Sequence, residues 1–135
     1  MRRFLLACSA LVLLGCGSDS TGPDASVVGT WDLQTVNNSA LPFTLQVDPN
    51  TNTRVEVISD QYVVHNGGTY DETFTTRTTS GTQVTEDPLT DAGTWTVHGN
   101  TVNLIASDGS ALVGTVNGDH ITAAIAGFTL VYVKE

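Results

Sequence analysis

The segment GTWTVHGNTVNLIA, residues 93–106, carries the pattern that decides the fold. Apolar and polar side chains alternate on both sides of the glycine–asparagine pair at 99–100, placing Trp95 before the pair and Val102 and Leu104 after it on inward faces. Alternation with a period of two is typical of a half-buried strand. Glycine and asparagine tolerate the positive φ that a tight hairpin turn requires. The segment therefore predicts an antiparallel hairpin with one apolar face.

The same pattern extends over residues 27–135, where threonine, valine and other β-formers dominate and no stretch has helical periodicity. Turn signals recur about every eight to twelve residues, which is typical of a sandwich or barrel. Before the hairpin, strands are predicted at 28–36, 44–48, 54–65, 69–78 and, weakly, 83–86. The prediction is an all-β fold, an antiparallel up-and-down meander of about eight to ten strands closed into a small barrel, because closure removes aggregation-prone edges.

The first fifteen residues differ from the rest of the chain. Arg2 and Arg3 precede an apolar run over residues 4–14, which is broken only by Ser9. A basic start followed by a short apolar run is typical of a secretory signal peptide. The run is shorter than the roughly 20 residues that a membrane-spanning helix needs. We therefore expect residues 1–15 to be a signal peptide that is cleaved.

Leu13-Leu14-Gly15-Cys16 resembles the lipobox of bacterial lipoproteins, in which cleavage precedes the cysteine and that cysteine carries acyl chains such as palmitate. The resemblance implies an anchor on Cys16 and a place in the cell envelope. A glycine after the cysteine, here Gly17, resembles the pattern of lipoproteins that are sorted to the outer membrane. The anchor would then lie in the periplasmic or the surface leaflet of that membrane. The alternative is an ordinary secretory signal with a chance cysteine. Residues 16–26 then form the lipidated cysteine and a flexible, polar linker.

Cleavage would also settle the cysteines and the charge. Cys8 would be discarded and Cys16 acylated, so the mature chain would hold no disulfide. Loss of Arg2 and Arg3 leaves three basic side chains against fourteen acidic ones, a net charge of −11. This acidic surface disfavours nucleic acid and anionic headgroups, which bind Lys/Arg patches. The membrane partner would be held through acyl burial, at about 0.8 kcal/mol per CH₂, and the protein is expected to be a monomer.

The tripeptide Gly-Thr-Trp occurs at 29–31 and again at 93–95. The first copy opens the domain and resembles the G-x-W signature of lipocalins. Together with Val36-Asn37-Asn38 and the closing segment 130–134, it looks like bacterial lipocalin-like domains, which are often lipoproteins. The resemblance implies that 27–135 is one lipocalin-like β-barrel. Lipocalins usually place an arginine on the last strand across the tryptophan, and Lys134 is the basic residue available here.

Inward aromatic residues could either fill such a barrel or line a ligand cavity. Glu72 shares a face with Tyr70 and Phe74, where its carboxylate could orient a polar ligand or could simply be solvated at the mouth. The residues expected to line a cavity are Trp31, Tyr62, Tyr70, Glu72, Phe74, Trp95, Phe128 and Tyr132. By analogy with lipocalins, the cavity would open away from the membrane.

The up-and-down order predicts where the turns lie. The N-terminal tether and the C-terminus would share one end of the barrel, with the turns at 37–40, 65–68, 86–91 and 107–109 at the other. This count places His65 at the opposite end from His98 and His120, so no three-histidine metal site is expected.

No Gly-x-Ser-x-Gly motif occurs, and most carboxylates are expected on turns or outward faces. We therefore predict no catalytic residues, no cofactor and no enzymatic activity.

The leading hypothesis is a lipid-anchored envelope protein that binds a small apolar ligand. The alternative is a structural, interaction or inhibitor-type lipoprotein with a filled barrel that works through its loops. A cavity of roughly 300 Å³ or more, the lower size of ligand pockets, would distinguish the two. The threonine-rich stretch 73–85 is either an exposed hairpin or a partner surface.

Overall fold

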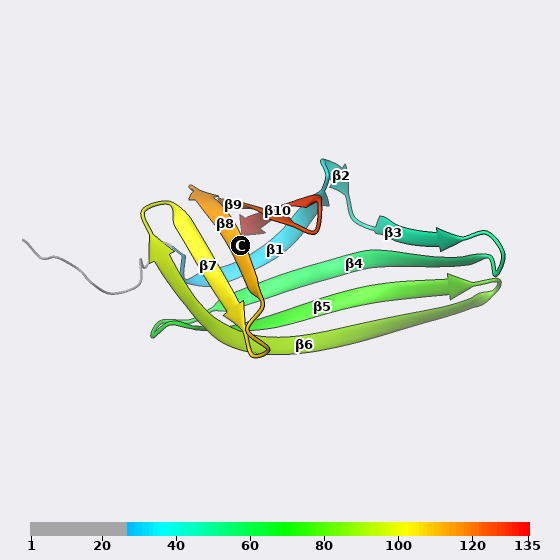
Figure 1. The fold of residues 1–135 in the computed structure, drawn as a ribbon, viewed down its shortest axis with the longest axis horizontal. Coiled ribbons are helices and arrows are strands. Elements are labelled where there is room, and N and C mark those ends of the chain that lie inside the picture. Colours follow the sequence, from blue (N-terminus) through cyan, green and yellow to red (C-terminus); the bar gives the residue numbers. More distant parts are fainter. Residues whose placement is uncertain (1–26) are drawn as a thin grey trace, which may run out of the picture.

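The computed structural model describes residues 27–135, in which every regular element is a β-strand (Figure 1). The predicted signal peptide, Cys16 and the linker lie outside the described residues. In the described part of the chain, no helix is long and apolar enough to cross a membrane. The strands are β1 (Gly29–Val36), β2 (Ser39–Ala40), β3 (Phe43–Asp48), β4 (Thr53–Val64), β5 (Thr69–Ser80), β6 (Gln83–His98), β7 (Thr101–Ala106), β8 (Ala111–Asn117), β9 (His120–Ile125) and β10 (Phe128–Lys134).

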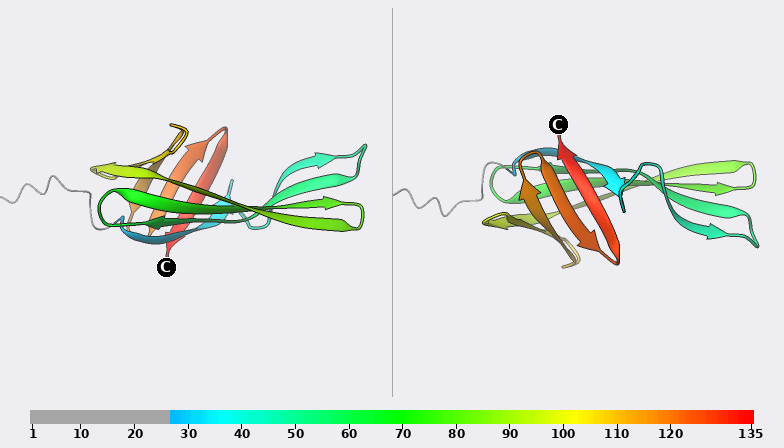
Figure 2. Two further views of the ribbon diagram at one scale, coloured as in Figure 1. Left: turned by 90° about the horizontal axis from the view of Figure 1, so that it is seen from below. Right: turned by 90° about the horizontal axis from the view of Figure 1, so that it is seen from above.

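Eight of these strands close into a barrel (Figure 2). The sheet order is β2-β1-β10-β9-β8-β7-β6-β5-β4-β3, and neighbouring strands are antiparallel. β1 pairs with β10 on one side and with the end of β4 on the other, where Trp31 lies opposite Tyr62. This second pairing joins the ends of the meander formed by β4–β10 and β1. The predicted antiparallel barrel of about eight to ten strands is confirmed.

Three strands, β4, β5 and β6, extend well past the barrel. The start of β4 pairs with β3, and β7 pairs with β6 only from Gly93 onward. The strand portions 43–48, 53–57, 76–80 and 83–87 therefore form a four-stranded extension, here called the protruding sheet (Figures 1 and 2). The threonine-rich stretch is the hairpin between β5 and β6 at the tip of this sheet.

The prediction of a turn at 86–91 was wrong, because these residues lie inside the sixteen-residue strand β6. The weak strand predicted at 83–86 is only its beginning. This part of β6 is an exposed edge strand without a buried face, so the sequence has no apolar alternation to mark it. Pro88 is compatible with the assignment because proline is tolerated on edge strands.

The two tryptophans fill the barrel core near the N-terminal end of the domain. Each is only 1% exposed. The indole nitrogen of Trp31 donates a 2.8 Å hydrogen bond to the Val27 carbonyl, and that of Trp95 donates a 3.0 Å bond to the His65 carbonyl. Both aromatic rings are thus buried with their single polar atom satisfied, as stable packing of tryptophan requires.

The first Gly-Thr-Trp motif is explained by Lys134 on the last strand. Lys134 pairs with Trp31, and its Nζ lies 5.5 Å from the centroid of the Trp31 ring. Gly29 has a φ of +140°, and a Cβ there would come within 2.7 Å of the Lys134 Cε. Glycine therefore lets the lysine stem cross the start of β1, so that its ammonium makes a cation–π contact with the ring. Lys134, the basic residue of the last strand, thus packs across Trp31.

Backbone hydrogen bonds gather several turns at the end of the barrel that holds Val27, here called the N-terminal end. The backbone N–H of Trp95 donates a hydrogen bond to the Gly68 carbonyl, and the backbone N–H of Lys134 donates one to the Asp119 carbonyl. The prediction that the 65–68 turn lies at the opposite end was therefore wrong. β3 does not return beside β1 but continues into the protruding sheet, and β4 runs back the whole way.

This change of strand direction also affects the histidines. His65, His98 and His120 each adjoin a turn at the N-terminal end, instead of being divided between the two ends. They nevertheless do not converge, since residues 27–135 contain no group of three or more potential ligands able to hold a metal ion. His65 instead contacts the Asp71 carboxylate at 2.8 Å.

Candidate functional site

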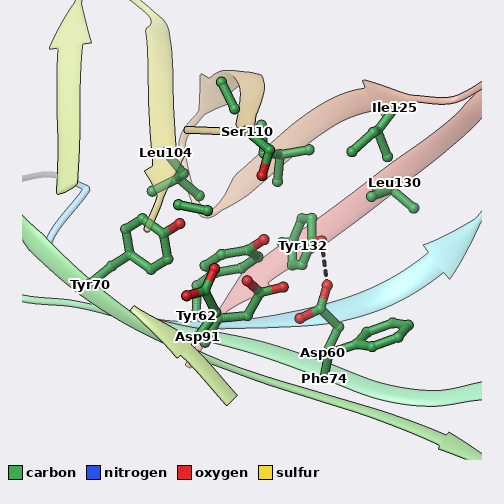
Figure 3. Close-up of a pocket in the computed structure, with 14 residues that line it drawn as sticks. Asp60, Tyr62, Tyr70, Phe74, Asp91, Leu104, Ser110, Ile125, Leu130 and Tyr132 are labelled. Atoms are coloured by element: carbon green, nitrogen blue, oxygen red, sulfur yellow. Dashed lines mark hydrogen bonds between the residues drawn. The ribbon is translucent and has the colours of Figure 1, made fainter. Parts of the chain in front are cut away.

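A cavity of about 280 Å³ lies among inward-facing side chains of the barrel (Figure 3). Its wall reaches Ser110 beside the β7–β8 turn and Ile125 beside the β9–β10 turn. Both turns lie at the opposite end of the barrel from Val27, because the strands alternate in direction. This end is called the open end below.

One wall of the cavity is built by three neighbouring strands, β4, β5 and β6. Tyr62 of β4 lies opposite Glu72 of β5, which in turn lies opposite Asp91 of β6. Asp60 lies opposite Phe74, one step further towards the open end. Side chains of cross-strand partners are neighbours on one face of a sheet. The pairing register therefore collects three carboxyl groups on the same wall.

Asp60 is the most deeply buried of these carboxyl groups, with only 6% of the residue exposed. Its Oδ2 accepts a 2.6 Å hydrogen bond from the Tyr132 hydroxyl of β10 (Figure 3). Its Oδ1 is also buried and has no hydrogen-bond partner among the described residues. Burying a polar atom without a partner costs about 1–3 kcal/mol, so this oxygen is available as an acceptor for a ligand when Asp60 is ionised.

The surroundings of Asp60 favour its neutral form. Burial raises the pKa of Asp60 to about 7, although the Tyr132 hydroxyl acts in the opposite direction, and the nearby Glu72 carboxylate raises it further. Burial also raises the pKa of Glu72, the Tyr62 hydroxyl lowers it, and the charge of Asp91 raises it. The wall therefore holds interacting carboxyl groups whose protonation is linked.

Asp91 is fixed in place from outside the cavity. Its Oδ1 accepts a 2.9 Å hydrogen bond from the Ser107 hydroxyl and a 2.8 Å bond from the backbone N–H of Ala92. Because Ser107 follows β7, this contact ties the middle of β6 to the turn at the open end. The carboxylate is held where β6 leaves the barrel for the protruding sheet.

The remaining wall is aromatic and aliphatic. The Tyr62 ring packs edge-on against Tyr70 and Tyr132, with ring centroids 5.4 Å and 5.5 Å apart. Gly93 lies opposite Tyr70, and a Cβ there would come within 2.8 Å of the Tyr70 ring. The second Gly-Thr-Trp motif thus leaves room for a tyrosine in the cavity wall. Further apolar side chains on the wall are Phe74, Leu104, Leu112, Ile125 and Leu130.

A family model described as a lipocalin-like domain matches residues 27–122. The chain belongs to the lipocalin-like family. No curated protein and no solved structure matches the chain. The match covers all of β4–β6 and hence the three carboxyl groups of this lipocalin-like barrel, whereas Tyr132 lies beyond it. A lipocalin-like barrel is compatible with ligand binding.

The lipocalin-like fold brings together five of the eight residues predicted to line a cavity. These are Tyr62, Tyr70, Glu72, Phe74 and Tyr132. The other three do not line this cavity. Trp31 and Trp95 fill the core, and Phe128 packs edge-on against Phe43 with ring centroids 5.9 Å apart.

Sequence reasoning missed two carboxyl groups of the lipocalin-like cavity, Asp60 and Asp91. Asp60 precedes Tyr62 by two residues, so the alternation along the predicted strand already placed it on the inward face. Asp91 gave no such signal, because its segment was predicted to be a turn. The wall of this cavity combines apolar side chains with three carboxyl groups, of which only Glu72 was predicted.

Proposed function

We propose that this lipocalin-like protein is a non-enzymatic, lipid-anchored binding protein that holds a small amphipathic molecule in its barrel. The observation that supports the proposal is the cavity of about 280 Å³, whose wall combines apolar side chains with three carboxyl groups. Its volume is slightly below the roughly 300 Å³ at which ligand pockets begin, so it suits only a small ligand. A wholly apolar ligand would leave the buried Asp60 Oδ1 without a partner, so a ligand with a polar end fits better.

The proposed anchor is acylated Cys16, followed by the linker 17–26. A linker of about ten residues spans at most roughly 35 Å, which keeps the domain near the bilayer. Val27, the first residue of the domain, lies at the opposite end from the cavity mouth. This arrangement supports a mouth directed away from the membrane. The expected location is the cell envelope, at the outer membrane.

Native mass spectrometry of the protein purified from its own host would test the binding function. Ala106 lines the cavity, whereas its neighbour Ile105 is exposed on the outer face of β7. Ala106→Phe should fill the cavity and abolish retention of a small molecule, while Ile105→Phe should retain it. A wild-type protein that carries and takes up no small molecule would refute the binding function.

A partner-binding role is the second candidate, because the protruding sheet exposes apolar side chains. Val47 and Val84 are each more than half exposed, and the cross-strand register places both on the same face of this sheet. Exposed apolar patches often mark interaction sites. Photo-crosslinkers at Val84 and at Val113, an exposed residue on the barrel, would separate the two roles. A partner that reacts only at Val84 would support this candidate, whereas equal or absent reaction would contradict it.

A further inference from the structure

We propose that the ligand of the cavity carries a protonated amine, which Asp60 binds directly and which the neighbouring carboxyl groups of Glu72 and Asp91 attract. This inference rests on the proposed binding function and specifies the chemistry of the polar end. Glu72 and Asp91 are direct cross-strand partners, and Asp60 lies on the neighbouring strand of the same wall. An ammonium group offers up to three N–H donors, and carboxylates accept these in short, charge-assisted bonds.

The unsatisfied oxygen of Asp60 provides an independent reason to expect a donor in the cavity. Asp60 Oδ1 is buried and lacks a partner among residues 27–135, while Oδ2 is already bonded to Tyr132. Once Asp60 is ionised, a ligand N–H at this position would satisfy the one buried side-chain oxygen that lacks a hydrogen-bond partner among residues 27–135. A hydroxyl could donate one such bond, but it would not offset the negative charge of the wall.

Basic side chains of the described residues do not neutralise this wall. Arg77 makes 3.0 and 3.2 Å hydrogen bonds to Glu56, and Arg54 lies 4.0 Å from the same carboxylate. Lys134 lies over the Trp31 ring at the N-terminal end. The cavity lining includes none of these three cations. A positive group from the ligand would therefore supply the missing counter-charge.

Two other ligand classes fit the observations less well. A fatty acid or other anion would place a further negative charge beside Glu72 and Asp91, which costs free energy in a partly buried site. A divalent metal ion needs a cluster of converging ligands, and the described residues contain no group of three that could hold one. The tyrosines and leucines of the wall also match an organic amine with an apolar body.

The test compares phenethylamine, phenethyl alcohol and hydrocinnamate, which share an aromatic body and differ in their polar end. Isothermal titration calorimetry would use the mature protein in a non-ionic detergent, with Ala106→Phe as the blank for partitioning into micelles. We expect the amine to bind at least about tenfold more tightly than the alcohol, a difference of about 1.4 kcal/mol. Hydrocinnamate should bind weakest.

Glu72→Gln and Asp60→Asn should each reduce the preference for the amine over the alcohol by about threefold, which is about half of the expected difference in binding free energy. Glu86→Gln is the matched control, because Glu86 is an exposed carboxylate that lies opposite Arg77 on the protruding sheet. It should leave the preference unchanged. The double variant Asp60→Asn/Glu72→Gln, checked for folding by circular dichroism, should remove the preference.

The possible outcomes separate this inference from the proposed function. Binding of the alcohol or hydrocinnamate as tightly as the amine, or a host-derived ligand without an amine, would overturn the inference and leave a binding protein. A preference for the amine that persists in the double variant would also overturn it. Absence of binding by all three probes, together with no host-derived ligand, would overturn the proposed function itself.

Discussion

The Tyr132 hydroxyl donates a 2.6 Å hydrogen bond to Oδ2 of Asp60, and so joins two strands that are not neighbours in the barrel. Tyr132 lies on β10 and Asp60 on β4, with β1 between them. The bond passes over the inner face of β1, where both partners are almost completely buried. The hydrogen bond therefore links β10 and β4, the two strands that flank β1, and it fixes the most deeply buried carboxyl group of the cavity.

Removal of the Tyr132 hydroxyl should destabilise the fold. Tyr132→Phe keeps the ring but leaves both oxygens of Asp60 buried without a donor, so we expect the free energy of unfolding to fall by about 1–3 kcal/mol. Urea denaturation would measure this change. In an Asp60→Ala background the same substitution should cost almost nothing. An equal cost in both backgrounds would show that the hydrogen bond does not contribute.

Asp60 should make stability depend on pH. Its pKa is about 7 in the folded protein against an ordinary value of 3.8, so the folded state binds this proton more tightly than the unfolded state. The contribution to the free energy of unfolding therefore decreases as pH rises from about 4 to about 7. At about 1.4 kcal/mol per pKa unit, the loss is on the order of 4 kcal/mol.

Asp60→Asn should remove this dependence, because the amide does not ionise. Denaturation at several pH values should show the variant gaining stability over the wild type as pH rises towards 8. Asp87→Asn, which changes an exposed carboxylate on β6, is the control and should leave the dependence in place. A stability difference between Asp60→Asn and wild type that is constant with pH would contradict the assignment.

An amine bound beside Asp60 should also release a proton. The groups around this carboxyl are Tyr62 on β4, Glu72 on β5, Asp91 on β6 and Tyr132 on β10. A cation among them favours ionised Asp60, so binding near pH 7 should release about half a proton. Calorimetry in buffers with different ionisation enthalpies measures this number. Asp60→Asn should release markedly less, and proton uptake by the wild type would contradict the prediction.

Gly93 should tolerate no side chain. A Cβ at this position would lie 2.0 Å from the Ile105 carbonyl oxygen and 2.8 Å from the Tyr70 ring, so Gly93→Ala requires a shift of the β6–β7 pairing. We expect a loss of at least about 3 kcal/mol, at the upper end of overpacking costs. Ala92→Ser adds one atom at the exposed neighbouring position and should change the melting temperature little. Similar melting temperatures for the two variants would contradict the close contact.

The lipid anchor can be tested without reference to the barrel. Cys16→Ser should abolish labelling with a palmitate analogue and release the protein from membranes, because acyl chains provide the proposed attachment. Cys8→Ser should leave both properties unchanged, since Cys8 lies within the predicted signal peptide. Membrane attachment that persists in Cys16→Ser would refute the anchor.

The exposed part of β6 is the strand segment that could not be predicted from the sequence. Apolar alternation identified the 93–106 hairpin because its inward side chains are buried in the barrel core. Residues 86–90 lie in the same strand, but they are exposed and face no core, so the acidic segment 86–91 resembled a turn. The unexpected course of β3 had the same origin, since its partner was the extended part of β4 rather than β1.

The sequence by itself determined most of the strands, most of the hairpin turns and the lipocalin-like character of this protein, because backbone alternation and turn chemistry are local properties. It also placed Tyr62, Glu72 and Phe74 on inward faces. Only the tertiary structure decided that Asp60 and Tyr132, seventy-two positions apart, meet in one cavity wall. Their meeting depends on the pairing of β1 with both β4 and β10. That closure is set by the packing of the whole barrel, which no local pattern of residues specifies.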